Sequence, residues 1–398
     1  MRQPPNRTAA GLSFDGRTMP THPAPPAGEL QSPSVPLNGA SLERALLRRL
    51  RLQTKPPGSL GLLEQIGVRL GRLQATTHPR AEVFRLCVFA GSHGIAEHGV
   101  SAYPPEVTAQ MIGNFLGGGA AVCVLARAAG ASLHVINAGV DFGNAAAPDP
   151  LNVGPIPGST RYFNRSIRPG TRCFSREPAM TAAECDLALE AGREQALLAL
   201  ADGIDVLAIG EMGIGNSTSA SALCAALLPA PADAVVGLGT GIDSDRLKRK
   251  IQLVGEAVRK YAGAVRSEDT GRFWLQHVGG LEIAAMVGCI LAASEVGLPL
   301  LVDGFIASAA ALVAARIAPP ALDCCFFAHR SAETGHALVL GELGATPMLQ
   351  LGMRLGEGTG AALAFPLLRA ATRLLNEMAT YEAAGVSEAL PSPIEVPR

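Results

Sequence analysis

The chain has 398 residues and a formal net charge of −1, with 48% hydrophobic and 17% charged residues. This composition supports a sizeable core and excludes global disorder, and the near-zero charge argues against a nucleic-acid-binding coat, which needs a basic face. The eight cysteines form no C-x-x-C pair. The sequence therefore predicts neither a zinc ribbon nor a thioredoxin-like motif, and it fits a reducing, cytoplasmic compartment.

The first 38 residues are rich in Pro, Ser, Gly and Thr and have little apolar periodicity, so residues 1–38 are predicted to be a disordered extension. The N-terminal segment lacks a short basic stretch followed by an apolar core, so we expect no signal peptide. A helical pattern begins at Ser41, its expected N-cap, and resumes after Pro56 and Pro57. These two helices precede any strand, and we expect them to pack as a helical subdomain.

Short apolar runs then alternate with longer helical stretches. Strands, or strands running into loops, are expected at residues 84–91, 132–141, 204–210, 234–243, 298–305 and 324–331. Runs rich in Val, Ile and Leu, separated by helices, predict an α/β fold: a Rossmann-like parallel sheet flanked by helices on both faces.

The same pattern gives expectations for the segments between the strands. Residues 107–130 are predicted as helix, glycine break and helix, residues 143–172 as loops, and Thr181 as lying near the start of a strong helix. The most apolar region, residues 280–322, is interrupted by charges and prolines, which favours buried helices and strands over a membrane span.

We expect one domain over residues 39–392. Its large α/β part covers about 80–345, and its small helical part combines about 41–78 with 358–392.

Several predicted strands end in a loop that contains glycine and a polar residue. These loops read GSHG, NAGVD, GEMGIGNST, GLGTGID, VDGF and HRSAE, the last of which is followed two residues later by Gly335. In open α/β sheets the ligand site lies where loops leave the carboxyl ends of the strands. Six such loops in one chain predict a single site, with a ligand that the backbone approaches closely.

The loop GEMGIGNSTSAS, which begins at Gly210, resembles an anion-binding turn. It is neither a Walker A loop nor G-x-G-x-x-G, yet it follows a strand and opens a helix, with Ser217 or Thr218 placed to cap it. Free backbone N–H groups and the helix dipole at such an end favour an anion. A glycine-rich turn that serves only packing is the alternative.

A second carboxylate, Glu357, stands between Gly356 and Gly358 just before another helix. A glutamate at a helix start is explained by the dipole alone, but the flanking glycines leave room for a ligand. Apolar neighbours such as Met353 and Leu355 would raise its pKa and suit it to act as a base.

A ligand that matches an anion cradle and nearby acids carries a phosphate and a positive centre, as a pyridinium nucleotide does. No D-D-x-x-D pair, H-E-x-x-H motif or acidic run is present, so no catalytic metal is predicted.

The histidines invite a metal interpretation that the spacing does not favour. His93 and His98 are five residues apart with Glu97 beside the second, but glycines interrupt the segment and no third ligand is obvious. Structural or substrate-directed hydrogen bonds are the preferred interpretation, and the same holds for His329 and His336.

Taken in order, these blocks resemble the nicotinate-nucleotide–dimethylbenzimidazole phosphoribosyltransferases, which make the lower-ligand nucleotide of cobalamin. The resemblance runs from about Leu42 to Glu388 and rests on TKPPGSLG, FAGSHGIAEHGVSAYPPEVTAQM, INAGVD, GEMGIGNSTSAS, GLGTGID, VDGFIASAAALVA, HRSAETGH and LGMRLGEGTGAALAFPLL. It implies transfer of phosphoribose from nicotinate mononucleotide to 5,6-dimethylbenzimidazole without a cofactor. It also implies a homodimer, with an interface from the two leading helices or the region after Gly280.

The resemblance assigns roles to individual residues. Glu357 corresponds to the general base that takes the benzimidazole proton, and Glu211 to a second acid near the ribose. The other positions correspond to substrate contacts: Gly213, Gly215, Asn216, Ser217 and Thr218 beside the nucleotide, Lys250 and Ser331 at the phosphate, Asp303 and Gly304 in another site loop, and Tyr103, Gln110, Met353 and Leu355 around the aromatic base.

Two alternatives stay open at this point. One is a transferase on the same scaffold that uses phenolic or purine acceptors, because small differences in pocket shape set such preferences. The other is a nucleotide-binding module without catalysis, which would not need Glu357. A Rossmann dehydrogenase is disfavoured, since no G-x-G-x-x-G follows the first strand.

Overall fold

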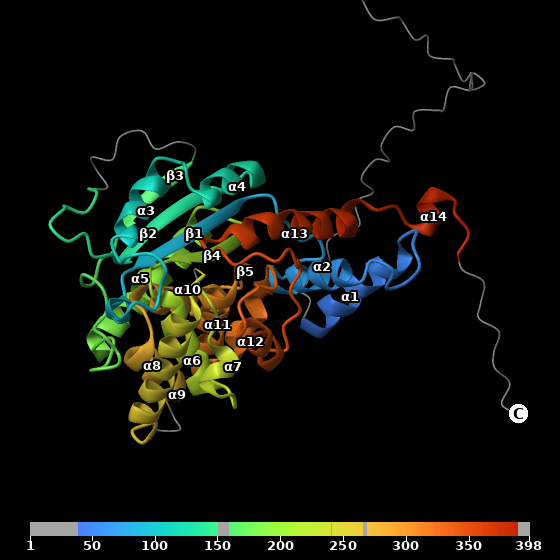
Figure 1. Cartoon of the computed structure of the whole chain (residues 1–398). Coiled ribbons are helices and arrows are strands. Elements are labelled where there is room, and N and C mark those ends of the chain that lie inside the picture. Colours follow the sequence, from blue (N-terminus) through green and yellow to red (C-terminus); the bar gives the residue numbers. More distant parts are fainter. Residues whose placement is uncertain (1–38, 150–158, 240, 266–268, 389–398) are drawn as a thin grey trace, which may run out of the picture. The chain divides into compact units, whose positions relative to one another are not determined.

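A parallel sheet organises the chain in the computed structural model, which describes residues 39–149, 159–239, 241–265 and 269–388 (Figure 1). Within these residues the strands are β1 (Phe84–Gly91), β2 (Ser132–Gly139), β3 (Thr160–Asn164), β4 (Val206–Met212), β5 (Leu300–Val302) and β6 (Cys325–Phe327). Neighbouring strands are parallel throughout, in the order β3-β2-β1-β4-β5-β6. The predicted α/β fold is confirmed.

Helices connect the strands and cover the sheet. They are α1 (Gly39–Leu52), α2 (Leu62–Leu73), η1 (Gly94–His98), α3 (Val107–Leu116), α4 (Ala121–Ala129), α5 (Ala182–Ala201), α6 (Asn216–Leu227), α7 (Ala232–Val235), α8 (Ser244–Ala262), α9 (Thr270–Val278), α10 (Leu281–Glu295), α11 (Phe305–Ile317), η3 (Pro319–Cys324), α12 (His336–Glu342), α13 (Thr359–Glu377) and α14 (Tyr381–Ala384).

Both faces of β1 are buried, which explains its unbroken apolar run. Leu86 and Val88 belong to a core shared with α3, α4 and α13, whereas Cys87 and Phe89 belong to the core formed with α5, α6, α10 and α11. Figure 1 shows α4 and α13 on one side of β1 and β4, with α6, α10 and α11 on the other. Alternate side chains of a strand point to opposite faces, so a strand covered on both sides carries no polar alternation.

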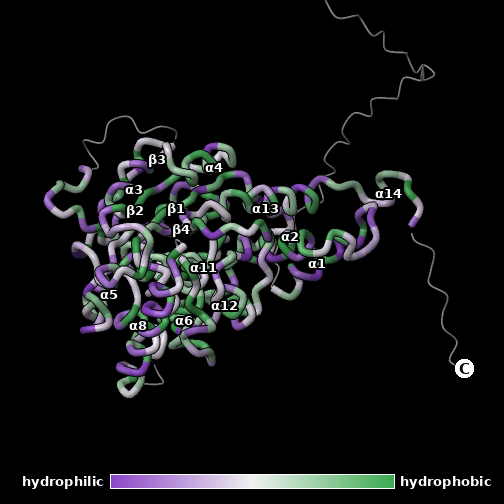
Figure 2. Tube along the Cα trace, viewed as in Figure 1, coloured by the Kyte–Doolittle hydropathy of each residue, from purple (hydrophilic) through white to green (hydrophobic). Residues whose placement is uncertain are grey.

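The most apolar segment of the sequence, residues 280–322, lies in the interior of the core that contains Cys87 and Phe89. The predicted burial of this segment is confirmed. In α10, the residues from Leu281 to Ile290 are all buried, and α11 is green in the hydropathy view while α8 is largely purple (Figure 2). Gly192 of α5 packs directly on the Ala285 carbonyl of α10. Small residues at such a crossing let two helix backbones approach closely.

One described stretch, Val107–Ala129, is long and apolar enough by composition to cross a membrane. It is divided into α3 and α4 by a turn that starts at Gly117, where α3 ends. Each piece rises about 15 Å at 1.5 Å per residue, half of what a bilayer core of about 30 Å requires. The predicted sequence of helix, glycine break and helix is confirmed.

The two leading helices pack on the second half of α13. Leu46 and Leu50 of α1, Val68 of α2 and Leu375 of α13 share a small apolar cluster, and Figure 1 shows the three helices side by side. The first half of α13 instead lies on the sheet, where Phe365 stacks on Phe84 with 4.0 Å between ring centroids. The division into an α/β part and a helical part stays a prediction.

Three local expectations were wrong. The first helix begins at Gly39, so Ser41 lies inside it and is not its N-cap. No strand occurs in the described part of 234–243, because this segment begins in the short α7 and continues as a loop. β3 was missed within 143–172, because this edge strand is only partly buried and carries polar residues. The extension predicted for residues 1–38 lies outside the described residues.

The strand order decides where a ligand site can form. The chain moves outward from β1 to β3 on one side and from β4 to β6 on the other. Loops leaving β1 and β4 therefore diverge, and the crevice of such a sheet lies at this switch point.

Candidate active site

Glu211 lies at the carboxyl end of β4, beside the switch point. The strand extends through Met212, so this glutamate belongs to the strand and not to the following loop. Its side chain is buried, and the Asn216 amide donates a hydrogen bond to its Oε2. Burial, followed by the charges of Asp303 and Glu282, raises the pKa of Glu211 well above its usual range.

The loop after Glu211 opens helix α6 as predicted, but its cap differs. Gly215 has φ +98° and is the N-cap, so neither Ser217 nor Thr218 caps the helix. The left-handed backbone conformation at this turn favours glycine, because glycine has no Cβ to clash. The Ile214 N–H donates to Thr108 Oγ1 at 3.0 Å, which anchors the loop to α3.

A buried cation accompanies the α6 N-terminus. Lys250 of α8 is fully buried, and its Nζ donates to Ser217 Oγ at 3.0 Å and to the Gly237 carbonyl at 3.2 Å. Burial lowers the pKa of Lys250 to about 8. An ammonium group at the N-terminus of a helix is a suitable site for an anion. The sequence-predicted residues Asn216, Ser217 and Lys250 are thus brought together.

Glu357 adopts a backbone conformation that is uncommon for a residue with a side chain. Its φ is +62°, between Gly356 at +84° and Gly358 at +89°. Left-handed residues other than glycine cost free energy and concentrate at functional sites. A Cβ on Gly210 would overlap the Glu357 backbone, and one on Gly356 would overlap Glu211 Oε1. The structure therefore packs the two glutamate segments directly against each other.

The Glu357 carboxylate is buried and partly without partners. Its Oε2 has no hydrogen-bond partner among the described residues. Burial raises the pKa of Glu357, an effect that the Val122 N–H in the first turn of α4 opposes and the charge of Asp303 reinforces. A carboxylate with a raised pKa and a free oxygen is suited to accept a proton.

Asp303 was predicted to contact substrate, and that contact stays a prediction; in the structure its side chain accepts backbone N–H groups. Its two oxygens accept the N–H groups of Gly358 and Ala361 at 3.1 and 3.0 Å. It thereby caps α13 and fixes the turn that carries Glu357. Burial raises the pKa of Asp303 to about 7, against the opposing effect of these N–H groups.

The loops after β5 and β6 meet behind this turn. Gly304 packs against the His329 ring. The Ser331 N–H donates to His336 Nδ1 at 2.8 Å, and His336 Nε2 lies 3.0 Å from Ser308 Oγ. These contacts agree with the structural interpretation of His329 and His336.

The four residues expected around an aromatic base are exposed or half-buried. Tyr103 and Leu355 expose 55% and 56% of their surface, Gln110 is exposed, and Met353 is half-buried. The Ala332 N–H donates to the Met353 carbonyl at 2.9 Å, so Met353 is attached to the loop after β6. Their contact with a base stays a prediction.

A cavity of about 240 Å³ opens beside the switch point, where the chain leaves β1 and β2. Its lining includes Ser92, His93, Glu106, Asp141 and Thr171. Sequence reasoning singled out His93 but missed two residues that contact it, Ser219 and Glu282. The GGLE tetrapeptide and a serine inside a helix carry no local signal for a site.

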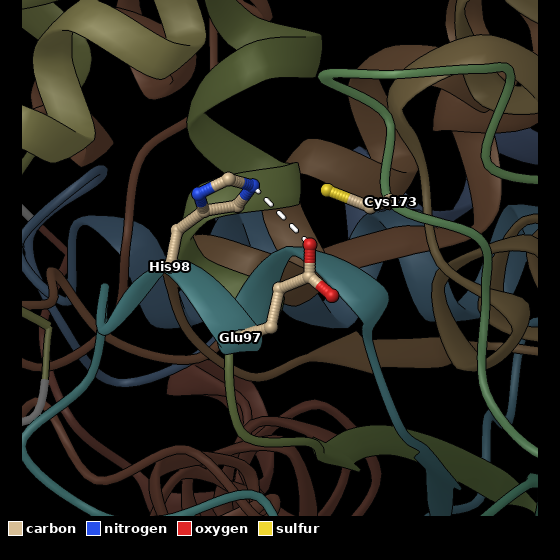
Figure 3. Close-up of side chains that lie close together, drawn as sticks. All are labelled: Glu97, His98 and Cys173. Atoms are coloured by element: carbon tan, nitrogen blue, oxygen red, sulfur yellow. Dashed lines mark ion pairs between the residues drawn. The ribbon is translucent and has the colours of Figure 1, made fainter.

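A further cluster combines Glu97, His98 and Cys173, whose ligand atoms lie within 4.8 Å of one another (Figure 3). Cys173 supplies the third ligand-type atom of this cluster, which the sequence did not reveal. Each of the three has a neighbouring partner, however. Arg176 pairs with Glu97, and Ser175 Oγ lies 3.2 Å from His98 Nε2 and 3.0 Å from Cys173 Sγ. These contacts account for the cluster, and we assign it no role in the reaction.

Comparison with known proteins gives consistent matches over nearly the whole described chain. The family model DBI_PRT, described as a phosphoribosyltransferase, matches residues 35–386. A nicotinate-nucleotide–dimethylbenzimidazole phosphoribosyltransferase of Dechloromonas aromatica is 46% identical over 89% of this chain and 98% of its own. A protein of the same name from Azotobacter vinelandii is 48% identical over 90% and 97%.

A solved structure is similarly close. The crystal structure of CobT from Thermus thermophilus superposes with a TM-score of 0.80 at 44% identity, covering 87% of this chain and 99% of that one.

Proposed function

The chain belongs to the DBI_PRT phosphoribosyltransferase family, and on this premise we propose that it transfers phosphoribose from nicotinate mononucleotide to 5,6-dimethylbenzimidazole. The products are α-ribazole 5′-phosphate and nicotinate, in the assembly of the cobalamin nucleotide loop. The relatives' shared name supports these substrates.

One observation carries the proposal: two buried carboxylates, Glu211 and Glu357, lie in directly packed segments close to an anion cradle built on Lys250. The nucleotide phosphate binds at the α6 N-terminus and Lys250. The pyridinium ring carries a positive charge, and its departure leaves positive charge on the ribose, which the fixed carboxylate of Glu211 stabilises in the transition state.

Glu357 accepts the proton of the benzimidazole as the other ring nitrogen attacks C1′. The C1′–N bond to nicotinate breaks as the new bond forms on the opposite face, so a β-nucleotide gives an α-nucleotide. The leaving pyridine is neutral at its ring nitrogen, and the sequence carries no motif for a metal.

The test is incubation of the purified protein with nicotinate mononucleotide and 5,6-dimethylbenzimidazole. Mass spectrometry should show α-ribazole phosphate, and NMR of the anomeric proton should show the α configuration. A panel with phenol and adenine in place of benzimidazole decides the acceptor. Product from neither the benzimidazole nor the panel would contradict the proposal and favour a binding module.

We also propose that the protein acts as a cytoplasmic homodimer. Leu47 and Leu52 of α1 expose 42% and 43% of their surface, which supports an interface on the leading helices. The alternative interface, the region after Gly280, is disfavoured because the α10 residues there are buried within the chain.

A further inference from the structure

A buried polar group lies directly beside the acid pair. His93 Nε2 is 2.6 Å from Glu282 Oε1, and His93 Nδ1 is 3.1 Å from Ser219 Oγ. The side chains of His93 and Glu282 have no exposed surface, and Ser219 is fully buried. Polar groups buried to this degree are retained only where partners offset the cost of losing water.

The group joins three elements at the switch point. His93 follows β1 and precedes η1, Ser219 ends the first turn of α6, and Glu282 lies in the first turn of α10. The ring is therefore in contact with the helix that carries the anion cradle. Its position fixes that helix relative to the end of β1.

Three glycines pack so closely on His93 that a side chain at their positions would contact it. A Cβ on Gly280 would overlap ring atom Cε1, and one on Gly213 would overlap the Gly91 carbonyl and press on the ring. Gly215, the N-cap of α6, packs on His93 Cβ. The backbone on both sides of the cradle is thus shaped to the imidazole.

A second buried histidine shows what a purely structural pair looks like. His134 of β2 lies 3.0 Å from Gln195 Oε1 of α5, and both residues are fully buried. Its partner is a neutral amide, and the pair lies between β2 and α5. Both pairs hold side-chain atoms without a hydrogen-bond partner in the described part of the chain, namely His134 Nε2 and Gln195 Nε2 in one and Glu282 Oε2 in the other. Glu282 differs in being a carboxylate, which can carry a charge.

The Glu282 charge acts on the site. It contributes to raising the pKa of Glu211, after burial and Asp303. Glu211 is faced by Glu282 from α10, Asp303 after β5, Glu357 before α13 and the Asn216 amide of α6. Of the histidines, His93 contacts Glu282, and His329 Nε2 lies 3.9 Å from Asp303 Oδ1.

We propose that His93 and Glu282 are positioning residues for the donor nucleotide: the imidazole fixes the Gly213–Asn216 turn and the α6 N-terminus, and the carboxylate adds to the negative field around the positively charged pyridinium ring of the donor. This inference rests on the proposed phosphoribosyl transfer. Neither residue is assigned contact with the reacting atoms.

The first test is the isosteric E282Q variant. Removal of the charge makes Glu211 easier to ionise, so the acid limb of kcat/KM against pH should move to lower pH. The KM for nicotinate mononucleotide should rise about tenfold, because the charge-assisted hydrogen bond between Glu282 and His93 becomes a neutral one and supports the turn less well, with little change in the KM for 5,6-dimethylbenzimidazole.

The second test is H93Q, which should raise the KM for the nucleotide selectively because the turn loses its support. The matched control is H134Q, which should lower the melting temperature without moving the pH profile or either KM. If E282Q fails to fold, H93Q alone tests the inference. A rise in its KM for nicotinate mononucleotide, with an unchanged KM for 5,6-dimethylbenzimidazole, would support the positioning role.

An active wild type in which E282Q and H93Q lose only thermal stability, as H134Q does, would overturn the inference and leave the proposed function intact. A wild type without turnover on any acceptor would contradict the proposed function and this inference together.

Discussion

At the residue scale, Glu357 concentrates three unfavourable features: burial, a left-handed backbone and an oxygen without a partner among the described residues. Each feature lowers stability, and proteins retain such residues where function requires them. Glu211 and Lys250 are also buried ionisable groups with shifted pKa values. Perturbed ionisable groups in one crevice are typical of active sites.

The E357Q variant should keep the shape of the turn and lose the base. We expect kcat to fall about 10²–10⁴-fold, the usual contribution of a general base, while the affinity for nicotinate mononucleotide changes little. Steady-state kinetics and calorimetric titration measure the two quantities. The exposed Glu377, the last residue of the helix α13 that follows Glu357, provides the control E377Q, which should behave as wild type. Retained turnover in E357Q would show that Glu357 is not the general base.

The raised pKa of Glu357 predicts a pH dependence. A base works only when ionised, so kcat/KM falls as the pH drops through its pKa. Burial and Asp303 place that pKa above the ordinary glutamate value of about 4.3. The rate profile should therefore lose activity at a higher pH than a solvent-exposed glutamate would require. Because the site's carboxyls interact, the apparent pKa belongs to the set. An acid limb at or below the ordinary value of about 4.3 would contradict the prediction.

Substitution of Lys250 should weaken nucleotide binding without lowering thermal stability. K250M removes a buried charge whose partners are neutral oxygens, so the melting temperature should stay the same or rise. The KM for the nucleotide should increase at least about tenfold, since hydrogen bonds to charged groups contribute about 1.5–3 kcal/mol. Thermal melts and kinetics on the same sample test this. A large drop in melting temperature with unchanged KM would show that Lys250 is structural.

At the element scale, the tight crossing of α5 and α10 depends on residues without side chains. Gly192 of α5 and Gly288 of α10 each pack on the other helix's backbone. The predicted start of α5 is also confirmed: Thr181 accepts the Glu184 N–H, and the Glu184 side chain accepts the Thr181 N–H. Caps and crossings together hold α5 and α10 over the sheet and so fix the turn that carries Glu282.

G192A should therefore destabilise the protein strongly. Its methyl group would overlap the Ala285 carbonyl, and such overpacking typically costs about 1–3 kcal/mol. Gly341 in α12 has nothing within 4 Å of an added Cβ, so G341A should instead stabilise by about 0.5–1 kcal/mol through helix propensity. Urea unfolding of the two variants measures both changes in the free energy of unfolding. A neutral G192A would show that the helices can separate at little cost.

At the scale of the whole molecule, two observations bear on function. The switch point between β1 and β4 collects loops from distant parts of the chain, and the apolar side chains exposed on α1 suggest a partner. Monomers with a large core still expose single leucines, so association has to be measured.

The proposed homodimer predicts a molecular mass near twice 41.0 kDa in light scattering after gel filtration. The double variant L47E/L52E should shift the mass toward the monomer, because two charges on a shared apolar surface are costly to bury. Glutamate substitution at Leu338, exposed at 43% on α12, serves as the control. A monomeric wild type would refute the proposal.

The amino-acid sequence by itself determined the layered α/β fold and the bounds of β1, because an unbroken apolar run shows locally that both faces of a strand are covered. It located β2 and β4 to within two residues and β5 and β6 with longer bounds, missed the partly buried β3, and wrongly predicted a strand over 234–243. It also singled out Glu211 and Glu357 through their glycine-flanked turns, and their roles in the reaction stay predictions.

Tertiary structure alone decided which strands are neighbours, that Asp303 caps the helix behind Glu357, and that Glu282 and Ser219 reach His93. These contacts join residues that lie far apart in the sequence. Such approaches arise from how helices pack on the sheet, and no local pattern of residue types encodes them.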